Sequence, residues 1–265
     1  MTFSVLMAVY IKEKAGYLEQ CLESLACQTL LPSEIILVED GELTKELAEV
    51  IAHYSTTLPI KIIKLKKNQG LAAALNVGLA NCSNELVARM DTDDVAFPNR
   101  FERQVGFMVA HPDVSVSSAW IEESDQVMSK PGILKKLPES HKEILLFSKL
   151  RNPINHPASI FRRCAVLSVG GYPLIFPEDY ALWALMLVNG FRFANLPEVL
   201  LQMRTGQDFI ARRGLDFLKK EIVLLKYFRL IGFFGFRESL YYFLTRSILR
   251  ISPAKIRVLI YRFSR

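Results

Sequence analysis

The 265 residues are 51% hydrophobic and 23% charged, which excludes a disordered chain and supplies enough apolar side chains for a large core. The net charge of +6 is unevenly spread, because residues 1–200 hold 19 Lys and Arg against 23 Asp and Glu, whereas residues 201–265 hold 14 against 4, a local charge of +10. The longest apolar runs fall short of the roughly 18 residues of a transmembrane helix, and the four cysteines lack the paired spacing of a zinc or redox motif.

Strands and helices are predicted to alternate over the first ninety residues. Short apolar runs predict strands at 4–10, 34–41, 60–66 and 86–91. Helical periodicity predicts helices at 18–25, 46–54 and 70–80. This alternation predicts an α/β fold with a mostly parallel sheet and helices on both faces. Ligands bind beyond the carboxyl ends of strands in such sheets, so we expect Tyr10, Glu39, Asp40 and Asp91 to share one crevice.

After Pro98 the pattern loosens. We expect a helix at 100–109, a strand at 114–120 and a helix at 142–150, followed by a mixed region up to Arg204. The last fifty residues are expected to form helices appended to the main domain. The chain therefore divides into 1–215, the main domain, and 216–265, a basic amphipathic helical tail.

The segment "RMDTDD" (89–94) places three carboxylates within four residues. Like charges this close repel one another, so the fold needs either full solvation or a cation to offset the cost. Asp91 and Asp93 form a D-x-D at a predicted strand end, which can direct both side chains at Mn²⁺ or Mg²⁺. Because Mg²⁺ is usually shared with substrate phosphates, a phosphate-bearing substrate is the natural partner. An acidic turn or a helix cap is the alternative interpretation.

Five motifs carry a resemblance to a known family. They are "SVLMAVY", "SLACQTLLPSEIILVEDG", "NQGLAAALNVGLA", "RMDTDDVAFPNRFERQV" and "FPEDYALW". In this order and spacing the chain resembles the inverting family 2 glycosyltransferases of GT-A fold, over about residues 3–205. The most similar subgroup is the bacterial enzymes that build O-antigen and exopolysaccharide repeat units. The resemblance implies a Rossmann-like central sheet and metal-dependent transfer of a sugar from a nucleotide-sugar, expected to be a UDP-sugar, to a polyprenyl-diphosphate-linked saccharide.

The resemblance also implies a set of donor-binding residues: Ala8, Tyr10, Asp40, Lys67, Gly70, Arg89, Asp91 and Arg204. Tyr10 would pack on the uracil ring, and Asp40 would accept a hydrogen bond from the base. The N–H groups at the start of the 70–80 helix would favour the nucleotide, although Lys67 could equally be a solvated surface charge.

Four arginines could serve the diphosphate. Arg89 lies on the same strand face as Asp91 and would either approach the diphosphate or balance the acids. Arg204 matches a position where the family often has a basic residue, and Arg212 and Arg213 could take this role instead.

Asp179 matches the catalytic base of the family, which removes the proton of the acceptor hydroxyl as that oxygen attacks. Glu178 would orient Asp179 or contact the acceptor, with helix capping as the structural alternative for both acids. Trp183, one helical turn further on, would stack on the acceptor sugar or fill the core. His156, in "NPINHPAS", is assigned to the acceptor or diphosphate region, with a purely structural histidine as the alternative.

Other functions fit parts of the same pattern. "VARMDTDDV" also matches the D-x-D-x-[TV] motif of haloacid-dehalogenase-like phosphatases, but that assignment leaves Tyr10 and Asp40 unexplained. A sugar nucleotidyltransferase would need a glycine-rich phosphate loop after the first strand, where none is found. A nucleotide-sugar-binding scaffold protein without turnover is the remaining alternative.

The basic C-terminal segment interleaves Lys and Arg with Leu, Ile, Phe and Tyr. This mixture favours an anionic membrane surface over nucleic acid as its partner. A helix pair that packs on the core and keeps its arginines in solvent is the alternative. We therefore expect a cytoplasmic protein, peripheral on the inner face of the cytoplasmic membrane. The donor sugar, the acceptor sugar and the oligomeric state are not indicated by the sequence.

Overall fold

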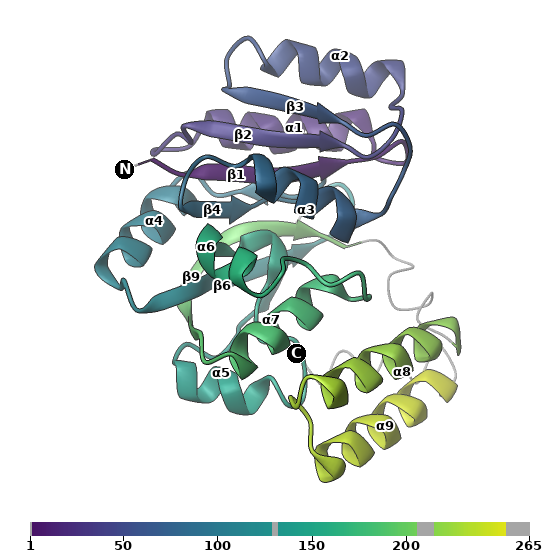
Figure 1. Cartoon of the computed structure of the whole chain (residues 1–265). Coiled ribbons are helices and arrows are strands. Elements are labelled where there is room, and N and C mark those ends of the chain that lie inside the picture. Colours follow the sequence, from purple (N-terminus) through teal and green to yellow (C-terminus); the bar gives the residue numbers. More distant parts are fainter. Residues whose placement is uncertain (1, 129–131, 206–214, 253–265) are drawn as a thin grey trace.

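Within residues 2–128, 132–205 and 215–252, which the computed structural model describes, one sheet of nine strands runs through the molecule (Figure 1). The strands are β1 (Ser4–Val9), β2 (Glu34–Glu39), β3 (Ile60–Lys64), β4 (Leu86–Arg89), β5 (Val95–Ala96), β6 (Val114–Ser124), β7 (Ile133–Lys135), β8 (Ile160–Arg162) and β9 (Arg192–Arg204). The helices are α1 (Ala15–Ala26), α2 (Lys45–Tyr54), α3 (Leu71–Asn81), α4 (Arg100–Ala110), α5 (His141–Phe147), α6 (Arg163–Ser168), α7 (Glu178–Val188), α8 (Leu215–Leu230) and α9 (Phe236–Ile251). A single 3₁₀ turn covers His156–Ala158 in this described part.

The strand order is β3-β2-β1-β4-β8-β6-β9-β5, with β7 paired to β6. The strands β3, β2, β1 and β4 are parallel, as the alternation of strands and helices predicts. The strand β8 then runs antiparallel to both β4 and β6, so the second half of the sheet is mixed. Figure 1 shows the strands β1, β2 and β3 ending on the same side of the molecule.

Alternating side chains on the buried strands supply two separate cores. On β1, Leu6 belongs to the core beneath α3 and α7, whereas Val5 and Met7 belong to the core beneath α1, α2 and α4. Ile36 and Ile35 of β2 divide in the same way. Successive strand residues point to opposite faces, so helices on both sides are needed to cover a sheet that is apolar on both faces.

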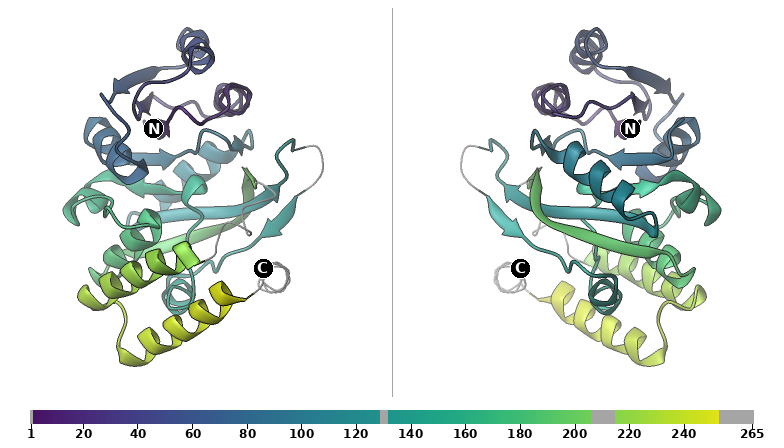
Figure 2. Two further views of the ribbon diagram at one scale, coloured as in Figure 1. Left: turned by 90° about the vertical axis from the view of Figure 1, so that its right-hand side faces the viewer. Right: turned by 90° about the vertical axis from the view of Figure 1, so that its left-hand side faces the viewer.

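The C-terminal helices extend the first of these cores. The strongest link is Phe228 of α8, whose ring lies 4.9 Å from that of Tyr180 on α7 and 4.9 Å from that of Phe234. Figure 2 shows α8 and α9 side by side at the margin of the molecule. No described helix is both long and apolar enough to cross a membrane.

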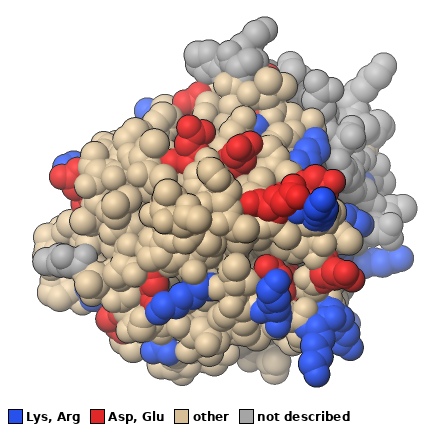
Figure 3. Space-filling view, turned by 90° about the horizontal axis from the view of Figure 1, so that it is seen from above, with Lys and Arg blue, Asp and Glu red and all other residues tan. Residues whose placement is uncertain are grey.

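The surface and the cysteines add two smaller facts. Seen from above Figure 1, acidic and basic side chains lie dispersed on a largely uncharged face (Figure 3). All four cysteines are free: Cys21 and Cys82 are buried, and Cys27 and Cys164 are exposed. The four thiols form no disulfide, and only the two buried ones contribute to packing in the core.

Candidate active site

A pocket of about 430 Å³ lies at the carboxyl ends of β1, β2 and β4. It is lined by Ala8, Val9, Tyr10, Glu13, Asp40, Asn68, Gly70, Leu71, Arg89, Asp91, Thr92 and Asp93. The crevice expected from the strand ends is therefore present, and it gathers seven of the residues assigned to donor or metal. Glu39 does not line it and forms an ion pair with Lys64 at 3.1 Å instead. A second groove of about 550 Å³, between α4 and β9, contains none of the assigned residues.

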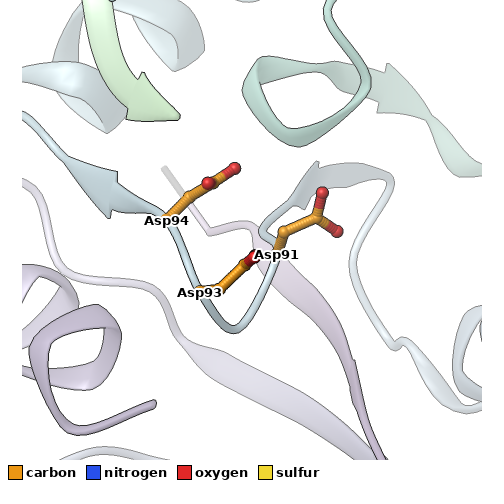
Figure 4. A group of neighbouring side chains, drawn as sticks. All are labelled: Asp91, Asp93 and Asp94. Atoms are coloured by element: carbon orange, nitrogen blue, oxygen red, sulfur yellow. The ribbon is translucent and has the colours of Figure 1, made fainter. Parts of the chain in front are cut away.

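Three carboxylates crowd the loop that follows β4. Ligand oxygens of Asp91, Asp93 and Asp94 all lie within 4.8 Å of one another, and Figure 4 shows the three side chains on this one loop. Burial, followed by the charges of Asp91 and Glu13, raises the pKa of Asp93 to about 7. Burial and the charges of Asp91 and Asp93 raise the pKa of Asp94 well above its usual value. The ionised forms of these carboxylates are therefore destabilised by burial and by their mutual repulsion.

Two buried arginines lie beneath this loop. Arg89 is 1% exposed, donates to the Leu6 carbonyl at 3.1 Å and forms an ion pair with Asp91. Arg100, at the start of α4, is fully buried and donates to the Arg89 carbonyl at 2.6 Å and to Gln104 Oε1 at 2.9 Å. Burial lowers the pKa of Arg100 to about 9, so it remains charged at neutral pH. Of the two predicted roles of Arg89, the observed contact is the balancing of an acid.

Arg204 fastens the other side of the loop. Its guanidinium donates to the Asp93 carbonyl at 2.8 Å and to Gln20 Oε1 at 2.7 Å, and it lies 3.9 Å from the Tyr17 ring centroid. Its backbone N–H donates to Asp94 Oδ1 at 2.8 Å. Arg204 is 8% exposed and does not line the pocket, so its observed role is to hold the acidic loop in place.

Asp40 lines the pocket and fixes the start of α3. Its two carboxylate oxygens accept the backbone N–H groups of Gln69 at 2.7 Å and of Gly70 at 3.0 Å. A Cβ at Gly41, whose φ is +92°, would lie 2.8 Å from the Asn68 nitrogen, so only glycine allows these two loops to approach so closely. The Gly70 N–H that was expected to face the nucleotide is therefore already bonded within the protein.

The two acids at the start of α7 lie within the electrostatic reach of the acidic loop. Burial, then the charges of Asp179 and Asp91, raise the pKa of Glu178 to about 7. Burial is also the main cause of the raised pKa of Asp179, while the Tyr180 N–H and the Asn152 side chain oppose it. Asn152 Nδ2 donates to Asp179 Oδ2 at 2.5 Å. The charge of Asp91 thus reaches both acids, although neither Glu178 nor Asp179 lines the pocket.

Two acceptor assignments lie in the core. Trp183 is fully buried, with its ring centroid 6.0 Å from that of Phe193 and 6.4 Å from that of Phe161. His156 is 7% exposed, its Nε2 lies 3.1 Å from Tyr172 Oη, and burial lowers its pKa well below the usual value. The burial of Trp183 fits its alternative role in core packing, and the burial of His156 fits its alternative role as a structural histidine.

The remaining assignments divide between exposed and undescribed positions. Lys67 is exposed and is not among the residues that line the pocket, which fits its alternative interpretation as a surface charge. Arg212 and Arg213 lie outside the described residues.

Four residues of the site escaped the sequence-based prediction. Asp94 was visible as the third acid of "RMDTDD", and Asn152 as the first polar residue of "NPINHPAS". Arg100 is part of the motif "PNRFERQ" but gave no sign of being buried. Glu13 lines the pocket and accepts a hydrogen bond from Thr92 Oγ1 at 2.8 Å, a contact with no local signal in the sequence.

The donor atoms of the acidic loop suit a hard divalent cation. Carboxylate oxygens are the ligands that Mg²⁺ and Mn²⁺ prefer. Asp94 Oδ2 is buried and has no hydrogen-bond partner among the described residues, which is costly unless a cation lies close by. Burial, followed by the charges of Asp91 and Glu13, also raises the pKa of Asp93, so a bound cation would stabilise its ionised form. The residues present therefore fit a metal.

Comparison with known proteins gives the following matches. Residues 4–170 match the model of the family described as glycosyl transferase family 2. The chain is 42% identical over 265 residues to the amylovoran biosynthesis glycosyltransferase AmsE of Erwinia amylovora, covering 99% of each chain. It is 40% identical over 262 residues to the UDP-Gal:alpha-D-GlcNAc-diphosphoundecaprenol beta-1,3-galactosyltransferase of Escherichia coli, covering 98% of this chain and 95% of that protein.

Solved structures share the fold. The S. aureus TarS 1-349 complex with UDP-GlcNAc superposes with a TM-score of 0.70 at 20% identity, covering 94% of this chain and 73% of that chain. The mannosyltransferase PcManGT of Pyrobaculum calidifontis, in complex with GDP-Man and Mn²⁺, gives 0.63 at 16% identity, covering 88% and 64%. These likenesses confirm the predicted GT-A fold.

Proposed function

This chain belongs to glycosyltransferase family 2, and we propose that it catalyses metal-dependent, inverting transfer of a sugar from a UDP-sugar to a polyprenyl-diphosphate-linked saccharide. The observation that carries the proposal is the proximity of two acidic groups, one able to bind a cation and the other at a helix start suited to take a proton. Family membership removes the phosphatase alternative, since it identifies the chain as a glycosyltransferase.

The donor is proposed to occupy the pocket at the strand ends. Tyr10, 43% exposed at the pocket wall, offers a ring for the base, and Asp40 lies beside it. Each Asp40 oxygen accepts one backbone N–H and retains a second lone pair, so the carboxylate can still accept a base N–H.

Asp91 and Asp93 would hold Mn²⁺ or Mg²⁺, with Asp94 as a third carboxylate within reach. When bound, the ion would offset the charge that develops on the leaving diphosphate. The protein contributes the fixed geometry of the loop, because Arg89 holds Asp91 and Arg204 holds the backbone of Asp93.

Asp179 is proposed as the general base. The acceptor hydroxyl oxygen forms a bond to the anomeric carbon of the donor, the bond from that carbon to the diphosphate oxygen breaks, and the hydroxyl proton passes to Asp179. Attack from the face opposite the leaving group inverts the anomeric centre. Asn152 and the Tyr180 N–H would hold the Asp179 carboxylate in place for the proton transfer, and Glu178 would contact the acceptor.

The relatives narrow the substrates to be tested. The Escherichia coli relative is named for UDP-Gal and a diphosphoundecaprenol-linked GlcNAc, and the Erwinia relative for amylovoran biosynthesis. By likeness, UDP-galactose is the proposed donor for this chain and a lipid-linked saccharide of an exopolysaccharide or O-antigen repeat unit is the proposed acceptor. Residues 1–215 would form the transferase domain, and 216–265 would associate with the inner face of the cytoplasmic membrane, where such an acceptor lies.

The test is a panel of UDP-sugars with Mn²⁺, measured first by thermal stabilisation and then by transfer to a diphosphoundecaprenol-linked GlcNAc in detergent. One UDP-sugar should stabilise the chain only with a divalent ion and should yield a longer lipid-linked product. Binding without transfer to any lipid-linked saccharide acceptor would favour the scaffold alternative. A failure of every UDP-sugar to bind would refute the proposed donor class.

A further inference from the structure

The helix α9 exposes apolar side chains on the side that faces away from the protein. Leu240, Tyr241, Leu244 and Ile248, here called the outward stripe, are 49%, 56%, 49% and 65% exposed. Tyr241, Leu244 and Ile248 follow one another at spacings of three and four residues, and Leu240 lies four residues before Leu244, so all four lie along one helix face. The stripe begins beside Phe236, which is 73% exposed, at the turn that follows α8.

The inward side of α9 carries the polar contacts instead. Arg250 is 3% exposed and donates from Nε and Nη2 to Glu221 of α8, at 2.9 and 2.7 Å. Tyr242, also buried, packs on Phe234 with their ring centroids 5.5 Å apart. A surface helix usually keeps its apolar side chains on the inward face, whereas α9 also carries them on its outward face. The buried ion pair fixes the rotation of α9, so the apolar stripe cannot turn into the core without leaving two charges unpaired.

Basic side chains border the stripe. Lys226, Arg229 and Arg237 are all exposed, and Arg229 and Arg237 lie directly next to Leu230 and Phe236 in the sequence. Leu230 is 84% exposed.

We propose that the outward stripe of α9, with the cations at the α8–α9 turn, is the surface that docks on an anionic lipid bilayer. An apolar strip flanked by Lys and Arg is complementary to the headgroup boundary of such a bilayer, where the apolar side chains enter and the cations remain at the phosphates. Basic side chains outnumber acidic ones at this end of the stripe, where Glu238 is the one exposed acid among Lys226, Arg229 and Arg237 of the described residues, and this excess favours an anionic surface over a protein partner. The inference deepens the proposed function and rests on it for the location of the acceptor in a membrane.

Aromatic contacts connect α8, which pairs with the docking helix α9, to the start of α7, where the proposed base lies. Phe217, in the first turn of α8, packs on Phe176 with ring centroids 5.5 Å apart, and Phe176 lies two residues before Glu178. Phe228 contacts Tyr180, the residue after Asp179. Figure 1 shows α8 lying alongside α7. The hairpin that docks would therefore set the orientation of the start of α7 towards the bilayer.

The experiment measures binding of the full chain to vesicles of mixed phosphatidylglycerol and phosphatidylcholine. The Leu240→Glu/Leu244→Glu variant should bind at least about tenfold more weakly, because two half-exposed leucines no longer enter the bilayer. The Lys226→Gln/Arg229→Gln/Arg237→Gln variant should lose about a hundredfold at low salt, the equivalent of ~1 kcal/mol for each cation near an anionic surface. Its binding should also depend less on salt.

The matched control is Leu31→Glu/Val109→Glu, which places two carboxylates at apolar positions that are 55% and 41% exposed, in the loop after α1 and on α4. It should bind vesicles as the native chain does. Donor binding and transfer to a detergent-solubilised acceptor should be unchanged in every variant, which separates this inference from the proposed function. Equal vesicle binding by the native chain and the leucine variant overturns the inference, as does a dimer that only the leucine variant disperses while vesicle binding persists.

Discussion

The sharpest test of the proposed chemistry is the substitution Asp179→Asn. The replacement keeps the size and shape of the side chain, and its carbonyl oxygen can still accept the hydrogen bond from Asn152 Nδ2. The amide cannot take a proton, so the contribution of a positioned base, roughly 10²–10⁴ in rate, should be lost. This corresponds to about 2.7–5.5 kcal/mol of activation free energy. The fold should be retained, because removing a carboxylate whose pKa is raised by burial also removes a desolvation cost.

The assay is initial-rate transfer to the lipid-linked acceptor, with the donor KM and the thermal midpoint measured in parallel. We expect kcat to fall and the donor KM and midpoint to stay close to native values. The matched variant is Glu178→Gln, which changes the neighbouring acid in the same helix turn. If Asp179→Asn transfers within about threefold of the native rate while Glu178→Gln abolishes transfer, then Glu178 is the base and our assignment is wrong.

The pH profile adds an independent reading of the same pair. The pKa of Glu178 is raised to about 7, so at pH 6 only about a tenth of its carboxyl groups would be ionised. If its charge helps to hold the acceptor, the native rate should rise about tenfold between pH 6 and pH 8. The Glu178→Gln variant should then lose that rise.

Three further predictions concern the metal loop and the core. Trp183→Ala should lower the free energy of unfolding by about 3–5 kcal/mol, because the substitution creates a cavity in the core. The acceptor KM of the folded fraction should change little. A large rise in that KM at unchanged stability would instead support the role of Trp183 in sugar stacking. Asp94→Asn should raise the thermal midpoint of the metal-free chain, because it removes a buried and partly unpartnered charge. The same substitution should raise the Mn²⁺ concentration needed for half-maximal activity by about tenfold or more. An unchanged Mn²⁺ dependence would exclude Asp94 from the surroundings of the ion. The folded pKa of Asp93 is raised from 3.8 to about 7, so its contribution to stability is complete below pH 4 and is lost as the pH rises through 7. Mn²⁺ should therefore raise the thermal midpoint more at pH 8 than at pH 6. Calorimetry that shows an equal gain at both pH values would contradict this prediction.

The first half of the fold was predictable because its strands are buried on both faces. Apolar runs as short as those of β1, β2 and β4 are typical of strands in the middle of a parallel sheet, and their polar ends mark the crevice. The three-residue strand β8 was missed, although it joins the parallel and mixed halves of the sheet. A strand this short has too few residues for a periodic pattern, and its pairing partners are more than forty residues away.

Site residues that cluster locally in the sequence could be predicted. The roles of residues that depend on whether the side chain is buried could not. Spacing places Trp183 on the same helix face as Asp179, but α7 is buried on nearly every side beyond its first turn, so the face alone cannot distinguish sugar stacking from packing. Likewise, Arg204 and Asn152 come from distant segments, and only the fold shows that their side chains hold the acidic loop and Asp179.

The acidic loop and its three arginines have a further consequence. Glu13 adds a fourth carboxylate beside Asp91, Asp93 and Asp94, so the acids of this loop outnumber the arginines Arg89, Arg100 and Arg204. In the proposed reaction a divalent ion would offset this excess and would also attract the diphosphate. Each should therefore increase the affinity for the other by one and the same factor, as thermodynamic reciprocity requires. The ion and the donor would then bind as a single unit.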